Sequence, residues 1–260
     1  AGRHYLEKQG KSTGVPEEEL IRTAVISLGL TDVAPFEPDK KIIEYQFKEV
    51  ENSLLDLNLR EFVNELSMDS PAPGGGSTAA LSGALSAALS SMVSNLTVGK
   101  KEYEAVQKNM KEFAVNAQAL KDEFLRAVDL DTMAFNKVMD AFKLPKKTDE
   151  QKEKKARAIE EASQEATLVP LGVLEKSFDA LELAKEVALK GNKNSLSDAG
   201  VAGLMAQAAA EGAYYNVMIN LPGLEDADFV SKAKKQAKTL VKKAQKLGDE
   251  LKEIIQKELK

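Results

Sequence analysis

A helical repeat of apolar residues runs from Leu54 almost to the end of the chain, and no segment there alternates as a β-strand does. Prolines and glycines divide this repeat into helices predicted at 56–67, 76–97, 101–143, 149–189, 197–220 and 226–259. Pro170, close to Gly172, predicts a kink or a break in the fourth of them. Because two helices approach about 40 residues, the sequence predicts an all-α fold, an elongated up-and-down helical bundle.

Two of the predicted helices are unusually rich in small residues. In 76–97, serines recur at every fourth position from Ser82 to Ser94, and a second seam of small residues runs beside them. The stretch from Ala199 to Ala210 is similar. Small side chains let helix backbones approach closely. We therefore expect these helices at the centre of the bundle, packed together or against a symmetry-related copy.

The first 50 residues differ from the helical part. A helix is predicted from Pro16 to Leu28, with Gly29 as its stop. The short apolar run Ile42–Tyr45 fits either a strand or a turn of helix, and a segment of this size is too small to fold alone. The chain opens without Met, as if in the middle of a fold. We expect residues 1–50 to be the remnant of a longer protein, and residues 51–260 to be the helical domain.

The amino-acid composition excludes several kinds of catalytic and metal-binding site. The chain has no Cys, which excludes disulfides, thiolate zinc sites and a cysteine nucleophile. Its one histidine, His4, excludes a Ser-His-Asp triad or a His-ligated metal deeper in the chain. A net charge of −5 argues against a nucleic-acid partner. Carboxylates, lysines, tyrosines, hydroxyls and backbone dipoles remain, so the sequence predicts a site without a metal.

The sequence also bears on the compartment. Residues 1–10 are polar and charged, which does not fit a signal peptide. The uncharged stretch from Pro71 to Gly99 is mostly alanine and is interrupted by serines, whereas a spanning helix needs about 20 predominantly apolar residues. We expect no membrane span and a cytoplasmic protein.

An apolar stripe on the predicted helix 101–143 contains one acidic residue, Asp131. Phe124 and Ala127 precede it at helical spacing and Phe135 follows it, whereas Asp129 lies about 200° further round the helix. A carboxyl group in such a seam is partly desolvated, which raises its pKa toward the range useful for acid–base catalysis. Asp131 is therefore the candidate catalytic residue. The alternative is a structural carboxyl group, satisfied by a hydroxyl or a lysine.

The segment Ser70–Ser77 precedes the first small-residue helix and contains two prolines and three glycines. Gly74, Gly75 and Gly76 expose backbone N–H groups, and Ser77 can cap the helix. A helix N-terminus with free donors suits an anion or a ligand carbonyl group. The segment lacks the Gly-Lys-Ser/Thr of a P-loop and the strand that precedes a dinucleotide fingerprint. A flexible loop with an ordinary cap fits its spacing equally well.

A second loop, Gly191–Asp198, leads into the other small-residue helix. Asp198 falls in the first helical turn, where the helix dipole favours negative charge, so capping explains it. The functional alternative is a carboxylate that binds a planar heterocycle, with Asn192 nearby. Late in the same helix, Asn216 and Asn220 have the spacing of core residues rather than of a site.

A series of short motifs follows in a characteristic order along the chain. In chain order they are Ser70–Ser77 with Ala79–Ala80, Asp131 with Ala134–Phe135, Leu144–Lys146, Val169–Leu171, Gly191–Asn192 with Ser197–Asp198, and Ala213–Leu221. Over about Leu54 to Lys260, this ordered series resembles the cyclodeaminase domain of the formiminotransferase-cyclodeaminase family. Residues 5–45 resemble the end of the formiminotransferase domain that precedes it in the family, which implies a short N-terminal remnant of an α/β domain in residues 1–50.

The resemblance implies a cyclodeaminase that converts 5-formimidoyltetrahydrofolate to 5,10-methenyltetrahydrofolate and ammonia in histidine degradation. It implies Asp131 as the catalytic residue, the residue that the apolar stripe indicates independently. The folate is a substrate, and no permanently bound cofactor is expected. Gly74–Ser77 are expected to bind a polar edge of the folate, and Asn192 or Asp198 to lie near the pterin.

Two alternatives remain open. Methenyltetrahydrofolate cyclohydrolase is a related activity that would use the same pocket with water as the nucleophile. A non-catalytic helical dimer that scaffolds other subunits is the other. The resemblance also implies a homodimer or higher homo-oligomer and a fused formiminotransferase domain upstream.

Overall fold

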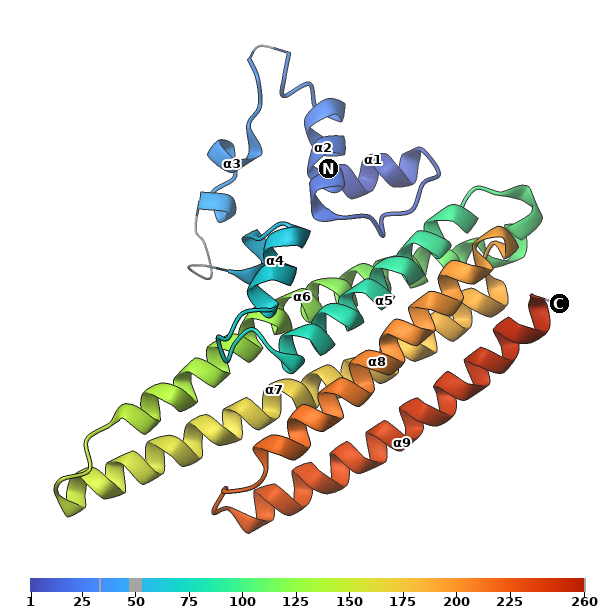
Figure 1. Cartoon of the computed structure of the whole chain (residues 1–260). Coiled ribbons are helices and arrows are strands. Elements are labelled where there is room, and N and C mark those ends of the chain that lie inside the picture. Colours follow the sequence, from blue (N-terminus) through green and yellow to red (C-terminus); the bar gives the residue numbers. More distant parts are fainter. Residues whose placement is uncertain (33, 47–52, 260) are drawn as a thin grey trace.

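The protein is an elongated helical bundle in this computed structural model, which describes residues 1–32, 34–46 and 53–259. The long helices α5 (Gly75–Thr97), α6 (Gln107–Lys143), α7 (Asp149–Lys190) and α8 (Leu196–Asn220) run up and down beside one another (Figure 1). Helix α9 (Ala227–Glu258) packs against α7 and α8. The described ranges contain no β-strand, so the predicted all-α bundle is confirmed.

Shorter elements precede and connect the long helices. They are the helices α1 (Gly2–Lys8), α2 (Glu17–Ser27), α3 (Pro38–Lys41) and α4 (Leu59–Leu66), and the 3₁₀ turns Glu44–Gln46, Leu54–Asp56, Lys101–Val106 and Lys193–Ser195. The helix predicted at 56–67 begins only at Leu59, because Asn58 and Glu61 form a capping box there. The helix predicted at 101–143 opens as a 3₁₀ turn, in which Tyr103 has a non-helical backbone conformation.

Helix α7 continues through Pro170, so the helix is not split there. Proline has no N–H group, and the Ala166 carbonyl therefore lacks its usual helical donor. The side-chain amide of Asn220, on α8, donates to this carbonyl at 2.7 Å. A side chain from the neighbouring helix thus satisfies the carbonyl that Pro170 leaves open.

The small residues of α5 and α8 place both helices at the centre, as predicted. A Cβ atom at Gly83 would lie 2.4 Å from the Phe124 ring of α6, and one at Gly203 would lie 2.2 Å from Leu251 of α9. Helix α5 has the length and apolar composition of a membrane span, but 56% of its most apolar stretch is buried inside the bundle. Its composition follows from this central position, because only small side chains fit between closely packed helices.

Two serines of the α5 seam carry hydroxyl groups with no partner. Ser86 and Ser90 are fully buried, and their Oγ atoms make no hydrogen bond within the described residues. An unpaired buried hydroxyl destabilises the fold by about 1–3 kcal/mol. Ser90→Ala is therefore expected to raise the free energy of unfolding by about 1 kcal/mol, measured by urea denaturation. Ser94→Ala is the comparison, since Ser94 donates to the Ser90 carbonyl; a loss of stability in Ser90→Ala would contradict the prediction.

The N-terminal part is docked onto the bundle (Figure 1). The Gly14 carbonyl accepts hydrogen bonds from Ser91 Oγ at 3.2 Å and from Asn95 Nδ2 at 2.7 Å, both on α5. A Cβ atom at Gly14 would collide with the Ala114 backbone at 2.2 Å, so glycine permits this close approach. The run Ile42–Tyr45 enters a 3₁₀ turn rather than a strand. The predicted boundary between residues 50 and 51 lies outside the described residues.

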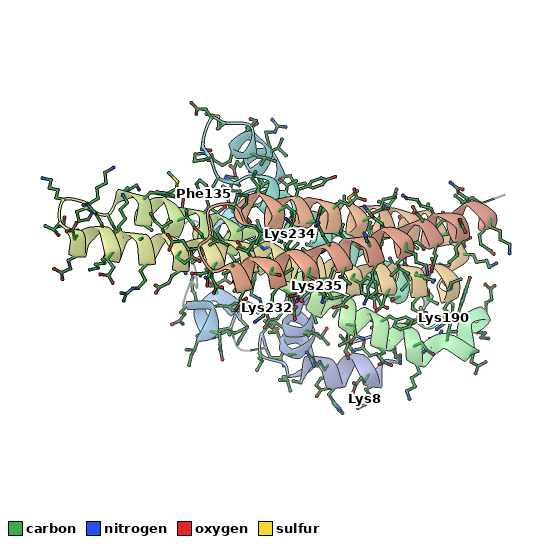
Figure 2. The ribbon with its side chains drawn as sticks, turned by 90° about the horizontal axis from the view of Figure 1, so that it is seen from below. Lys8, Phe135, Lys190, Lys232, Lys234 and Lys235 are labelled. Atoms are coloured by element: carbon green, nitrogen blue, oxygen red, sulfur yellow. The ribbon has the colours of Figure 1, made fainter. Side chains whose placement is uncertain are left out.

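The lysines of α9 are solvated, as expected for a charged outer face. Lys232, Lys234 and Lys235 are exposed along this outer helix (Figure 2). The opposite face of α9 buries Ala233 and Ala237 against the bundle.

Candidate active site

A cleft of about 460 Å³ opens where the start of α5 meets α6, α7 and the end of α8. It is lined by the glycine turn Gly74–Gly76, and α6 contributes Asp131 together with apolar side chains. The remaining walls come from α7 and α8 and carry both apolar groups and amides. The structure thus brings Asp131 and the three glycines, which are far apart in sequence, into one cavity.

Asp131 sits against the first turn of α5. Its carboxylate receives hydrogen bonds from the Ser77 hydroxyl, at 3.2 Å, and from the Ser77 backbone N–H. Ser77 is fully buried, and its Oγ also lies 3.0 Å from the Val128 carbonyl and 3.3 Å from Thr132 Oγ1. A carboxylate on α6 therefore satisfies one of the open N–H donors of α5.

Burial raises the pKa of Asp131 above the ordinary range of an aspartic acid, while the two hydrogen bonds from Ser77 act in the opposite direction. Desolvation is the larger effect, because removal from water penalises the charged form. In the described part of the chain, Asp131 is the one charged residue that lines the cleft. A carboxyl group in this position can both accept and release a proton closer to neutrality than an exposed aspartate can.

Gly76 makes the position of Asp131 possible. A Cβ atom at residue 76 would lie 2.0 Å from Oδ1 of Asp131, well inside van der Waals contact. The neighbouring Gly75 faces Asn216, whose Nδ2 would lie 3.4 Å from a Cβ atom there. The glycine pair therefore lets polar side chains from α6 and α8 approach the start of α5 from two sides.

Replacing Ser77 should shift the pH dependence of any reaction that uses Asp131. In the wild type, the hydrogen bond from the Ser77 hydroxyl lowers the pKa of Asp131. Ser77→Ala removes this hydroxyl and keeps the backbone N–H. The pKa of Asp131 is then expected to rise further, so the acid limb of the rate–pH profile moves to higher pH. An acid limb that stays in place, or moves to lower pH, would contradict this assignment. Ser70→Ala is the control, since Ser70 is exposed and lies outside the lining of the cleft.

Asp129, two residues away, has a structural role. Its carboxylate accepts hydrogen bonds from Ser53 Oγ at 2.5 Å and from the Leu54 backbone N–H at 2.8 Å. These contacts tie the segment before α4 to α6. Periodicity separated the two aspartates correctly, because residues two apart face different sides of a helix.

The apolar stripe that contains Asp131 changes environment along α6. Phe124 and Ala127 are buried in the core. Beyond Asp131, however, Phe135, Val138 and Phe142 line the cleft, and Phe142 is exposed. The second half of the stripe is therefore one wall of the cavity rather than core.

Asn192 and Asp198 do not reach this cleft. The Asn192 backbone N–H donates to Thr97 Oγ1 at 2.8 Å, at the far end of α5. Helix α5 rises about 30 Å from Ser77 to Thr97. Within one chain the structure therefore does not bring Asn192 and Asp198, which were expected near the pterin, to the cleft that contains Asp131. Sequence order does not reveal the helix end at which a loop lies. Asn192 joins the loop between α7 and α8 to α5.

The prediction that Ser77 caps α5 is also wrong. Helix α5 begins at Gly75, and Gly74 occupies the cap position without a side-chain hydrogen bond. Ser77 lies within the first turn and points at α6, below the cleft. Gly74, Gly75 and Gly76 line the cleft. Ser77 does not line it, but its hydroxyl donates a hydrogen bond to Asp131.

The helical spacing of Asn216 and Asn220 predicted core positions, whereas both residues line the cleft. They are four residues apart on α8 and face the glycine turn and α7. Asparagine is costly to bury without partners, and two asparagines on one apolar helix face were a signal that could have been followed. Among the described residues, no three His, Asp or Glu side chains are grouped so that they could hold a metal ion.

Family models match both parts of the chain. The model described as formiminotransferase-cyclodeaminase matches residues 58–239, and the formiminotransferase domain model matches residues 1–48. The first match includes the glycine turn, Asp131 and the asparagines of α8.

Individual relatives give the same picture. Formimidoyltransferase-cyclodeaminase from Mus musculus is 38% identical over 94% of this chain, but the match spans 45% of that protein, so the chain covers about half of it. Methenyltetrahydrofolate cyclohydrolase from Methylorubrum extorquens is 40% identical over 76% of this chain and 95% of its own length. The crystal structure of formiminotetrahydrofolate cyclodeaminase from Thermotoga maritima superimposes with a TM-score of 0.71 at 28% identity, covering 80% of this chain and all of that one.

Proposed function

Because the chain belongs to the formiminotransferase-cyclodeaminase family, we propose that it converts 5-formimidoyltetrahydrofolate to 5,10-methenyltetrahydrofolate and ammonia. The observation that carries this proposal is the partly buried Asp131 carboxyl group, which Ser77 holds beside the glycine turn in a cleft of about 460 Å³. A role in histidine degradation and a cytoplasmic location stay predictions from the sequence.

The proposed reaction needs one group that moves a proton. Nitrogen N10 attacks the formimino carbon. A bond forms between N10 and this carbon, and N10 then carries a positive charge. The Asp131 carboxylate takes the N10 proton and passes it to the amino group on the same carbon. The carbon–nitrogen bond to that group then breaks, ammonia leaves, and the N5 lone pair completes the methenyl cation. The amidinium substrate and the methenyl product carry the same charge, so Asp131 ends as it began.

Ser77 can support both protonation states of Asp131. While Asp131 is ionised, the Ser77 hydroxyl can donate to it across 3.2 Å. Once Asp131 is protonated, its own O–H can donate to Ser77 Oγ, and the Ser77 proton turns to the Val128 carbonyl at 3.0 Å. Neither state leaves a buried polar atom without a partner, which lowers the cost of the proton transfer.

The other cleft residues fit a folate. The N–H groups at the start of α5 suit a carbonyl oxygen of the substrate. Phe135 and Phe142 offer apolar surface to its rings. In this proposal Gly74–Gly76 bind a polar edge of the folate, and Asn192 and Asp198 take no part within the same chain. Since the ring closure joins two parts of one bound molecule, a rigid cleft contributes mainly by holding N10 close to the formimino carbon.

Methenyltetrahydrofolate cyclohydrolase is the second candidate. The Methylorubrum extorquens relative of that name matches almost along its whole length, which favours this activity for the helical part. The match of residues 1–48 to a formiminotransferase domain favours the cyclodeaminase, because that domain accompanies the cyclodeaminase in the relatives of that name.

We also propose that the chain forms a homodimer or a higher homo-oligomer. Helices α5 and α8 pack against each other, and both expose large apolar side chains, Leu85 and Leu96 on α5 and Val201 and Leu204 on α8. An exposed apolar surface of this kind is typical of an interface. Light scattering of the wild type and of Leu204→Lys tests it, and the variant is expected to have the lower mass. A monomeric wild type would contradict both the proposed homo-oligomer and the alternative of a helical dimer that acts as a scaffold.

The deciding experiment follows methenyltetrahydrofolate by its absorbance. Wild-type protein is given 5-formimidoyltetrahydrofolate in one assay and methenyltetrahydrofolate in another. Formation of the methenyl product with release of ammonia supports the cyclodeaminase. Activity in the hydrolysis assay alone would contradict the cyclodeaminase and favour the cyclohydrolase. Activity in neither assay would favour the non-catalytic scaffold.

A further inference from the structure

The cleft contains two side-chain amides whose orientation is fixed by the backbone. Asn216 Nδ2 donates to the Gly212 carbonyl at 2.8 Å, and Asn220 Nδ2 donates to the Ala166 carbonyl at 2.7 Å. A carbonyl oxygen only accepts, so each amide must turn its nitrogen toward the backbone. The Oδ1 atom of each amide accepts no hydrogen bond within the described residues.

Both free oxygens belong to residues that line the cleft. Asn216 lies beside Gly75, while Asp131 lies beside Gly76, so Asn216 and Asp131 flank adjacent residues of one turn. Asn220 follows Asn216 by one helical turn, where side chains on the same face are about 5–6 Å apart. No lysine or arginine is among the residues that line this cleft in the described part of the chain. Apart from the hydroxyl of Ser163, which can donate or accept, the polar side chains of the cleft thus present a carboxylate and two amide oxygens, which are hydrogen-bond acceptors.

Such a set discriminates between folates that differ at one atom. The formimino group of 5-formimidoyltetrahydrofolate is an amidine, which is protonated near neutral pH and carries N–H donors. A 5-formyl group has the same shape but ends in an oxygen, which only accepts. The 5,10-methenyl group has no N–H on either nitrogen of its cationic centre.

We propose that Asn216 and Asn220 are the specificity-determining residues of this site, and that their Oδ1 atoms accept hydrogen bonds from the amidine end of the substrate. This inference rests on the proposed cyclodeaminase function and adds the group by which the substrate is selected. Asn216, next to the glycine turn, holds the amidine nitrogen within reach of Asp131. Asn220 receives the next N–H donor along the cleft.

Pro170 is a positioning residue in this arrangement. Since it has no N–H, the Ala166 carbonyl stays open and orients the Asn220 amide. Pro170→Ala would restore an N–H that bonds Ala166 within α7 and would release Asn220. KM for the formimino substrate is then expected to rise about tenfold with little change in kcat, as for the loss of one hydrogen bond. An unchanged KM would show that Pro170 only shapes the helix.

The test compares binding of 5-formimidoyl- and 5-formyltetrahydrofolate by isothermal titration calorimetry. It uses the Asp131→Asn protein, so that no turnover interferes, and adds Asn216→Ala or Asn220→Ala. Each addition is expected to weaken formimino binding about ten- to a hundredfold, the loss of a charge-assisted hydrogen bond, and to leave formyl binding unchanged or tighter. Asn116→Ala, an exposed asparagine of α6, is the matched control.

Asn220→Ala leaves the Ala166 carbonyl without a donor, so it is also made together with Pro170→Ala, which supplies one. Selective loss of formimino binding in these proteins supports the proposal whether or not the wild type turns the substrate over. Equal loss for both ligands, or no loss, overturns it even if the wild type is an active cyclodeaminase. Absence of methenyl product from wild-type protein bears only on the proposed function.

Discussion

Asp131→Asn is expected to lower kcat for methenyltetrahydrofolate formation by about 10²–10⁴-fold, the usual contribution of a general acid–base group. Asparagine has nearly the same shape and can still accept from the Ser77 N–H, but it cannot carry the proton from N10 to the leaving nitrogen. The measurement is the initial rate of product absorbance at saturating substrate. Asp122→Asn is the matched control, because Asp122 lies on the same helix and is exposed.

The Tm of Asp131→Asn shows whether this variant folds, and its dependence on pH is itself a prediction. The pKa of Asp131 is raised in the folded protein, so between the unfolded and folded pKa values the folded state binds more protons. Wild-type stability therefore contains a contribution that is present at low pH and lost as pH rises through the folded pKa. Asparagine stays neutral, so the Tm difference between variant and wild type should move in the variant's favour from acid to neutral pH. Full activity in a folded Asp131→Asn protein would refute the proton transfer.

Gly76→Ala is expected to remove activity to a similar extent, about 10²-fold or more, through displacement of the reacting group. The added methyl group would lie 2.0 Å from Oδ1 and 2.4 Å from Cγ of Asp131, so the carboxyl group must move. Such a movement would disturb the hydrogen bonds that Asp131 accepts from the Ser77 hydroxyl and backbone N–H. Activity is measured beside the pH profile, since a displaced carboxyl group also changes its burial and hence its pKa.

Gly172→Ala provides the control for this substitution. Gly172 lies in helix α7, and a Cβ atom there would meet nothing within 4 Å. Alanine favours a helix interior over glycine by about 1 kcal/mol, so this variant should be active and slightly more stable. Wild-type rates in Gly76→Ala, with Asp131 in place, would mean that the carboxyl group and the start of α5 are not in contact in solution.

Periodicity predicted the long helices well because small or apolar residues recur at helical spacing along them, and prolines and glycines interrupt this repeat near their ends. Their ends were less well predicted where a local cap decides, as at Asn58 or Gly74. Asp131 was found because its position in an apolar stripe is a property of one helix alone. Asn216 and Asn220 were missed because their significance depends on Gly75 and on the Ala166 carbonyl, which lie on other helices.

The sequence by itself determined the all-helical architecture, the central place of the small-residue helices and the identity of the one acidic residue in the α6 seam. These are consequences of side-chain size and polarity repeated at the period of a helix. Only the tertiary structure decided which loop lies at which end of the bundle. It placed Gly74–Gly76 with Asp131, moved Asn192 and Asp198 to the far end of α5, and turned two asparagines into the cleft. The reason is that contacts between helices depend on their packing and direction, which no local pattern of residues specifies.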